Sequence, residues 1–358
     1  MYIKERIAAL RESMKKEGLD AYIIPSNDPH QSEYVANHWK SREWISGFSG
    51  SAGIAIVTRD HAGLWTDSRY FLQAEEELAS SEFELHKQGI PHAPEHITWL
   101  SQNLKPGGVI GCDGMLFSMK QIRYINSKIY GTDIELNTHH DLITKIWKDR
   151  PSLPQTEVFE HDLHLAGKSR KEKMDEVREQ MKAYGASHYL ISTLDDIAWL
   201  LNIRGRDVAF NPVSICYFIL GQKISYLFID PQKVPAQMKQ KLEHCGIVLK
   251  DYNEISNFLK SFNKKDKILI DSSSTSIGLF QLLPQEAVIQ GQNYVLLKKA
   301  IKNPTEIEHI RKVMVKDGVA LIRLFRWLDA ELEKRPVTEV EIAEKLIEYR
   351  SAQKYYYG

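Results

Sequence analysis

The chain has 358 residues, of which 43% are hydrophobic and 26% charged, a composition typical of a globular protein with two or three domains. Lys plus Arg and Asp plus Glu both number 47, and this zero net charge argues against a surface for nucleic acid or acidic lipid. The three cysteines, Cys112, Cys216 and Cys245, form no CxxC pair, which argues against a thiolate zinc site or a disulfide framework. The N-terminal stretch is charged and amphipathic without an apolar signal core, so we expect a cytoplasmic protein.

Helical and strand-like patterns alternate in the first part of the chain. Ile7, Leu10 and Met14 recur at helical spacing, and Gly18 is predicted to end that helix. Turn-rich residues 147–154 predict a linker. Between them we predict strands at 21–24, 82–85, 109–112 and 135–137, a hairpin with arms 54–57 and 63–66, partial helix within 30–44, and a helix ending near Leu78.

The first helix and strand recur after the linker at a constant offset of 167 residues. The matches are Arg11-Glu-x-Met-Lys with Arg178-Glu-x-Met-Lys, Gly18 with Gly185, and Tyr22-x-Ile24 with Tyr189-x-Ile191. An ungapped match that reproduces helix, helix end and strand indicates a duplicated α/β domain. Further strands are predicted at 214–220, 224–229 and 268–270, but the order of strands in the sheets stays open.

Two helices are predicted from about Lys302 onward. The first carries apolar residues at helical spacing, and the second follows Pro336 with Thr338 as its cap and Glu341 three residues later. Two such helices cannot form a core alone. Either they pack on the earlier domains or the chain is the first part of a longer protein, and we expect the latter.

Several polar motifs invite a catalytic interpretation that the residues do not complete. The stretch Gly47-Phe-Ser-Gly-Ser-Ala-Gly53 lacks the G-x-S-x-G spacing of a nucleophile elbow, so we interpret it as a turn that allows close backbone packing. There is no HExxH motif, and the pairs His161/His164 and His139/His140 are interpreted as surface histidines.

Three other groups stay open on the residues alone. Asp195 and Asp196 precede an apolar helical run, for which capping is the simplest role. Asp67 and Arg69 form either a structural ion pair or a pair that faces a substrate. Aromatic and basic residues interleave at 38–44, but without net positive charge this is weak support for nucleic-acid stacking.

Seven motifs, in order along the chain, carry a family resemblance. They are residues 22–34 (YIIPSNDPHQSEY), 46–53 (SGFSGSAG), 65–73 (WTDSRYFLQ), 145–151 (KIWKDRP), 194–207 (LDDIAWLLNIRGRD), 211–213 (NPV) and 302–311 (KNPTEIEHIR). Together they resemble the long, three-domain X-prolyl aminopeptidases (aminopeptidase P) over essentially the whole chain.

This resemblance implies a fold. It is an α/β architecture of two tandem creatinase-N-terminal-type domains, each a mixed sheet flanked by helices, at residues 1–152 and 153–300. Residues 301–358 would be the first helices of a pita-bread peptidase domain.

The implied activity is that of a metallopeptidase, a hydrolase that removes the N-terminal residue from peptides with proline at position two. Family members use two divalent metal ions, usually manganese, to activate a bridging water. Their ligands are two Asp, one His and two Glu, late in the pita-bread domain. The chain ends before those positions, so we expect no catalytic residue and no metal ligand in it, no bound metal, and an inactive fragment.

The resemblance assigns one substrate-binding residue, Arg69 in the WTDSRYF motif, with Asp67 and Tyr70 in support. It places Asn27, His30 and Glu33 in a matching loop without a specific role. For Asp195, Asp196, Arg204 and Asp207, interdomain polar contacts are as good an explanation as a function.

A rival interpretation is a non-catalytic module that binds peptides or proteins on a pita-bread scaffold. A creatinase or prolidase specificity is disfavoured, because those relatives usually carry a single N-terminal domain. The resemblance further implies proline-containing peptide substrates, no nucleic-acid or membrane partner, and a homodimer for the full-length protein.

Overall fold

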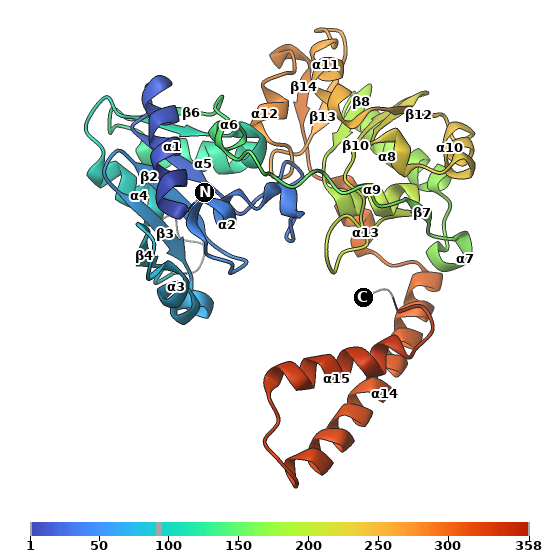
Figure 1. Ribbon diagram of the computed structural model, residues 1–358. Helices are drawn as coiled ribbons and strands as arrows, with labels where there is room; N and C mark the ends of the chain where they lie inside the picture. The colour runs from blue at the N-terminus through green and yellow to red at the C-terminus, as the bar shows by residue number, and fades with distance from the viewer. Residues whose placement is uncertain (1, 91–94, 357–358) are drawn as a thin grey trace.

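The computed structural model describes residues 2–90 and 95–356. Two α/β lobes lie beside each other, and a long helical hairpin extends from the second lobe (Figure 1). None of the helices in these residues is long and apolar enough to cross a membrane.

The first lobe is built on a six-stranded mixed sheet with strand order β4-β3-β2-β1-β5-β6. Strands β1, β2 and β3 pair in antiparallel fashion, whereas β3–β4, β1–β5 and β5–β6 are parallel. The strands are β1 (Ala21–Ile24), β2 (Ile54–Thr58), β3 (Ala62–Thr66), β4 (Glu84–Lys87), β5 (Val109–Cys112) and β6 (Glu135–Asn137).

The second lobe repeats this topology strand for strand, with order β12-β11-β10-β8-β13-β14. The pairs β8–β10 and β10–β11 are antiparallel, and β11–β12, β8–β13 and β13–β14 are parallel. The strands are β8 (His188–Ile191), β10 (Tyr217–Gly221), β11 (Ser225–Phe228), β12 (Ile247–Lys250), β13 (Ile268–Ile270) and β14 (Val288–Gln290). The predicted duplication is confirmed, and a small ladder of β7 (Phe159–Glu160) with β9 (Ile203–Arg204) is added to it.

Helices cover both faces of each sheet because strand residues alternate their apolar side chains between two cores. In the first lobe, Tyr22 and Ile24 face a core with α1, α3 and α6, while Ala21 and Ile23 face one with α4 and α5. The helices of the lobe are α1 (Ile3–Lys16), α2 (Ser41–Ser46), α3 (Phe71–Leu78), α4 (Glu95–Asn103), α5 (Met119–Ile129) and α6 (Leu142–Ile146). Those of the second lobe are α7 (Leu163–Ala166), α8 (Arg170–Ala183), α9 (Leu194–Leu201), α10 (Ala236–Glu243), α11 (Ile255–Lys260), α12 (Ile277–Phe280) and α13 (Tyr294–Ala300).

The repeated sequence positions perform repeated structural tasks. Gly18 and Gly185 follow α1 and α8 with φ of 70° and 67°, a left-handed conformation that glycine adopts without steric cost. Arg11 donates from Nε to the carbonyl of Thr58, and Arg178 donates in the same way to Gly221, so each arginine ties its helix to the end of the second strand of its sheet.

The two lobes share buried apolar structure. One core joins Ile23 and Ile110 of the first lobe to Leu194 and Val213 of the second, and another joins Met119 to the second sheet. Backbone hydrogen bonds also cross the boundary, from Met119 N to Thr275 O at 3.0 Å, from Lys120 N to Ser272 O at 2.9 Å and from Ile277 N to Phe117 O at 2.9 Å.

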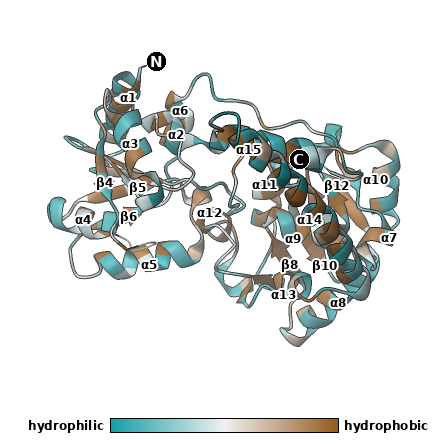
Figure 2. Cartoon of the chain, turned by 90° about the horizontal axis from the view of Figure 1, so that it is seen from below, coloured by the Kyte–Doolittle hydropathy of each residue, from teal (hydrophilic) through white to brown (hydrophobic). Residues whose placement is uncertain are grey.

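The hairpin consists of α14 (Pro304–Leu332) and α15 (Glu339–Ser351). Asn303 with Glu306, and Thr338 with Glu341, form capping boxes that start the two helices, so the predicted cap at Thr338 is confirmed. Brown apolar segments are visible along α14 in Figure 2. Its large exposed apolar residues include Val313, Met314, Val315, Ile322 and Phe325.

Most predicted elements are found within two residues of their predicted bounds. Strand β4 starts at Glu84 rather than residue 82, and 30–44 contains α2 and a short 3₁₀ turn at Asn37–Trp39. Strands β7, β9, β12 and β14 were not predicted, nor were helices α4 to α7 and α10 to α13. All three cysteines are unpaired, with Cys112 and Cys216 buried and Cys245 partly buried.

Candidate functional site

The WTDSRYF motif lies where β3 leaves the first sheet. Thr66 ends the strand, and Asp67 caps the 3₁₀ turn Ser68–Tyr70 by accepting from the backbone N–H of Arg69 at 3.1 Å. The Arg69 side chain folds back onto the same carboxylate. Its Nε and Nη2 donate to the two Asp67 oxygens at 2.9 and 2.8 Å, a bidentate pair.

This pair presents a fixed cation at the surface. The Arg69 side chain is 63% exposed, whereas that of Asp67 is only 16% exposed. The hydrogen bonds that Arg69 donates to Asp67, and then the negative charge of the Asp67 carboxylate, raise the pKa of Arg69 above its ordinary value. The guanidinium is therefore charged at every physiological pH and is oriented by a partly buried carboxylate.

Tyr70 connects this turn to the glycine-rich loop. Its hydroxyl lies 2.6 Å from Ser51 Oγ, and its ring meets the Phe48 ring edge-on at 5.9 Å. The Arg69 guanidinium carbon lies 5.2 Å from the centre of the Tyr70 ring, within the range of a cation–π contact. Predicted site residues 67, 69 and 70 thus form one connected group.

The loop 47–53 is packed as a scaffold, in agreement with its interpretation as a close-packing turn. Buried Arg42 donates to the carbonyls of Phe48 and Gly50. A Cβ on Gly50 would lie 2.3 Å from the Phe48 ring and 2.7 Å from that of Tyr70, so no side chain fits there. The Ser51 hydroxyl is used by Tyr70, which leaves the loop as the support of the Arg69 turn.

The loop at 27–33 serves the contact between the lobes. His30 is fully buried, with Nδ1 2.8 Å from the carbonyl of Ser192 and Nε2 3.0 Å from the Tyr252 hydroxyl. Burial lowers its pKa, so the ring is neutral at pH 7. Asn27 donates to the carbonyl of Leu116 at 3.2 Å, and Glu33 is exposed. The sequence assigned no role to His30, which the structure identifies as an interdomain contact.

Asp195 and Asp196 lie inside the first turn of α9 rather than before it, so their prediction as caps preceding the helix is wrong. Both pair with Lys299 of α13, and Asp196 also accepts from Asn293 Nδ2 at 2.6 Å. These contacts are within the second lobe, not between lobes.

Arg204 and Asp207, in the same motif at residues 194–207, also make their contacts within the second lobe. Arg204 donates to the carbonyl of Ala198 at 2.8 Å. Asp207 is buried and pairs with Lys233, while the backbone N–H of Ile215 donates to it at 2.7 Å.

The predicted histidine pairs do not form a metal site. His164 and His139 are exposed, and His161 and His140 are half-buried. Burial, followed by the charge of Arg204, lowers the pKa of His161 to about 4. His140 Nδ1 lies 3.5 Å from a Glu17 carboxylate oxygen.

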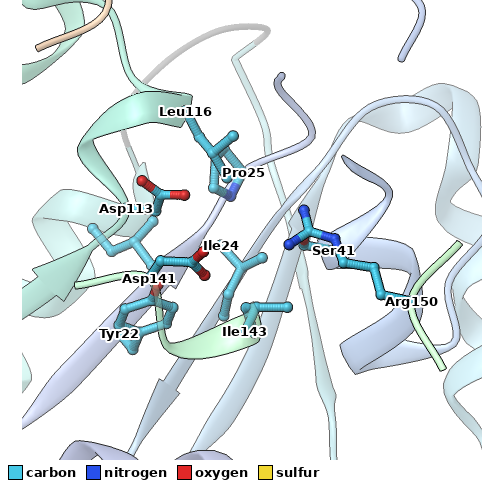
Figure 3. Close-up of a pocket in the computed structure, with 10 residues that line it drawn as sticks. Tyr22, Ile24, Pro25, Ser41, Asp113, Leu116, Asp141, Ile143 and Arg150 are labelled. Carbon is cyan, nitrogen blue, oxygen red and sulfur yellow. The ribbon is translucent and has the colours of Figure 1, made fainter. Parts of the chain in front are cut away.

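A small hollow beside β1 was not predicted. Asp113 and Asp141 lie on one side of it and the Arg150 guanidinium on the other (Figure 3). Burial, with a smaller effect from Asp141, raises the pKa of Asp113 to about 7. The hollow holds about 10 Å³, about the room of one water molecule, so it is not a ligand site.

The described residues do not fit a dinuclear metal centre. The one group of three or more possible ligands in residues 2–90 and 95–356 is His61, Glu84 and His86, with a single carboxylate. Three ligands with one carboxylate are too few to hold two ions.

Comparison with known proteins gives the family. The Creatinase/Prolidase N-terminal domain family matches residues 6–146 and, in a second match, residues 149–306. The chain is 36% identical to Xaa-Pro aminopeptidase 1 of Dictyostelium discoideum over 98% of its own length and 58% of that protein. It is 35% identical to aminopeptidase P2 of Arabidopsis thaliana over 98% of its length and 54% of the relative.

A solved structure of an X-prolyl aminopeptidase is also similar to this chain. The X-prolyl aminopeptidase of Caenorhabditis elegans, described as a cytosolic enzyme with a dinuclear active site, superposes with a TM-score of 0.92 at 29% identity over 100% of this chain and 61% of that one. The chain thus spans somewhat more than half the length of these relatives. The two tandem matches together span most of the chain, which therefore belongs to the Creatinase/Prolidase N-terminal domain family and is similar to X-prolyl aminopeptidases along its whole length.

Proposed function

We propose that this chain is the N-terminal portion of a metal-dependent Xaa-Pro aminopeptidase, which releases the N-terminal residue from peptides with proline at position two. The observation that carries the proposal is the similarity to Xaa-Pro aminopeptidase 1 at 36% identity over 98% of the chain. The resemblance of the WTDSRYF motif to the family supports the same assignment.

In this proposal Arg69 binds the peptide. Asp67 occupies its Nε and Nη2, which leaves the N–H donors of Nη1 pointing away from the pair. A guanidinium held in this way recognises a peptide carbonyl or carboxylate without first being ordered. Asp67 and Tyr70 are positioning residues, because they fix the guanidinium but turn their own polar atoms to Arg69 and Ser51.

We place the two divalent ions, manganese in our proposal, on residues that are not part of this chain. The relatives are longer than the chain, and the described residues offer no matching ligand set. The 358-residue chain alone is then inactive. When bound, the ions activate a water for attack on the peptide carbonyl, and this chain contributes binding and orientation only.

The domain division that goes with this function is 1–152, 153–300 and 301–358. We further propose that the full-length enzyme is a cytoplasmic homodimer. The Caenorhabditis elegans X-prolyl aminopeptidase is described as a cytosolic enzyme, which supports the proposed cytoplasmic location.

The test compares Arg69→Ala with Arg59→Ala in the full-length protein loaded with manganese. Arg59 is a matched control, because it is a 73% exposed arginine of the same lobe that also pairs with an aspartate, Asp20, at 2.7 Å. Arg69→Ala should lower kcat/KM for Arg-Pro-Pro by about tenfold, while Arg59→Ala leaves it unchanged. Equal kcat/KM in the two variants would remove the assignment of Arg69, and absence of Xaa-Pro cleavage by the full-length protein would remove the proposed activity.

A further inference from the structure

Three possible metal ligands converge at the outer edge of the first sheet. In the parallel pairing of β3 with β4, Gly63 lies opposite Glu84 and Trp65 lies opposite His86. Residues two apart in a strand point to the same face. Glu84 and His86 therefore stand side by side on one face, next to a position in β3 that has no side chain.

His61 fills that vacant position from the turn between β2 and β3. A Cβ on Gly63 would lie 2.8 Å from His61 Nε2 and 2.5 Å from the Trp65 ring, so the glycine makes room for the imidazole. His61 Nε2 lies 3.1 Å from His86 Nε2, and His61 Nδ1 lies 3.8 Å from a Glu84 oxygen. One ligand atom from each of the three residues lies within 4.8 Å of the others.

Two indoles hold the imidazoles in place. The His86 ring stacks on Trp65 with centres 4.0 Å apart and planes 10° apart. The His61 ring packs on Trp99 of α4 at 4.6 Å, and Trp99 also contacts Trp65 at 5.4 Å. The two rings are thus oriented by packing before any ligand arrives, which lowers the entropic cost of binding.

The three side chains offer suitable ligand atoms, because a neutral imidazole has one nitrogen with a free lone pair. The Glu84 carboxylate adds a negative charge on the solvent side of the two histidines, since its side chain is 69% exposed.

We propose that His61, His86 and Glu84 bind one zinc ion, with water as the fourth ligand. Zinc takes imidazole nitrogens and carboxylate oxygens at about 2.0–2.2 Å in a tetrahedron, in which neighbouring ligand atoms are about 3.3 Å apart. The 3.1 Å between the two Nε2 atoms already fits this separation. Only the exposed Glu84 side chain has to move inward.

The site is separate from the Arg69 turn. His61 precedes β3, and Glu84 and His86 lie opposite Gly63 and Trp65 within that strand, whereas Asp67 follows its last residue, Thr66. A bound ion would join the β2–β3 turn to β4, the edge strand of the sheet. The binding of zinc here does not depend on the proposed peptidase activity.

The experiment titrates zinc into the metal-free 358-residue chain by isothermal titration calorimetry. The wild-type chain should bind one equivalent. His86→Ala and Glu84→Gln should weaken binding by roughly tenfold or more, the scale on which metal sites respond to lost ligands and their partners. His244→Ala, which alters an exposed histidine after α10, is the matched control and should bind as the wild-type chain does.

A second measurement guards against loss of folding in the histidine variant. Glu84 is exposed, so Glu84→Gln should keep the fold and carries the test by itself. Cobalt(II) should give the intense visible absorption of a tetrahedral site in the wild-type chain and in His244→Ala, but not in His86→Ala. No zinc binding by the wild-type chain, or equal affinity in the wild-type chain and Glu84→Gln, would overturn the proposal.

Discussion

Acid should weaken the fold through one buried histidine. His96 lies in the first turn of α4, is only 8% exposed, and its Nδ1 has no hydrogen-bond partner among residues 2–90 and 95–356. Burial lowers its pKa to about 4 from the usual 6.5, because the charged ring would lose its hydration without gaining a partner.

The size and sign of the effect follow from this pKa. The folded-state value lies below the unfolded one, so as pH falls the unfolded chain takes up the proton first. The contribution of neutral His96 is complete above pH 6.5 and is lost as the pH falls toward 4. At about 1.4 kcal/mol per pH unit, the loss over this window is about 3 kcal/mol.

The assay is urea unfolding of the wild-type chain and of His96→Phe at a series of pH values between 7.5 and 4. Other titrating groups act equally in both proteins, so they cancel in the difference between the two free energies of unfolding. That difference should move by about 3 kcal/mol in favour of His96→Phe as the pH falls, whereas His244→Ala should track the wild-type chain. Parallel curves for the wild-type chain and His96→Phe would refute the reasoning.

Three further substitutions test a buried ion pair of the second lobe, the contact between the lobes and the packing around the Arg69 turn. Lys233→Met leaves the Asp207 carboxylate buried without its cation and should cost about 3–5 kcal/mol in urea unfolding; a loss below 1 kcal/mol would contradict this. Tyr252→Phe removes the hydroxyl that meets buried His30 at 3.0 Å and should cost about 1–3 kcal/mol, so an unchanged free energy of unfolding would mean that this bond contributes nothing. Gly50→Ala places a methyl group against two aromatic rings and should lower stability by about 1–3 kcal/mol; an unchanged melting temperature would show that the loop has room for it.

The architecture could be predicted because its signals are local and repeated. The helix, its glycine end and the following strand are each encoded in adjacent residues, and the second copy at Arg178–Ile191 reproduces the first. Strands β12 and β14 were missed because they are the two edge strands of their sheet, where Val248 is exposed and Ile289 is only partly buried. Such strands lack the continuous apolar run that marks a central strand.

The side-chain groups were harder to predict because they depend on strand pairing. Asp67 and Arg69 are two residues apart, so their pairing could be predicted from the sequence. His61 and His86 are 25 residues apart and meet only through the register of β3 with β4, which no short motif encodes. The role of His30 depends on a lobe that begins more than 100 residues later.

The shared cores between the lobes have a thermodynamic consequence. Two duplicated domains joined by a linker could unfold in separate steps. Here Met119 of the first lobe is buried in the core of the second sheet, and Leu194 and Val213 of the second are buried with the first. Exposing either lobe would therefore open cavities in the other, which couples their unfolding. The two lobes should therefore unfold in one cooperative transition. In that case the duplication produced a single folding unit from two similar domains.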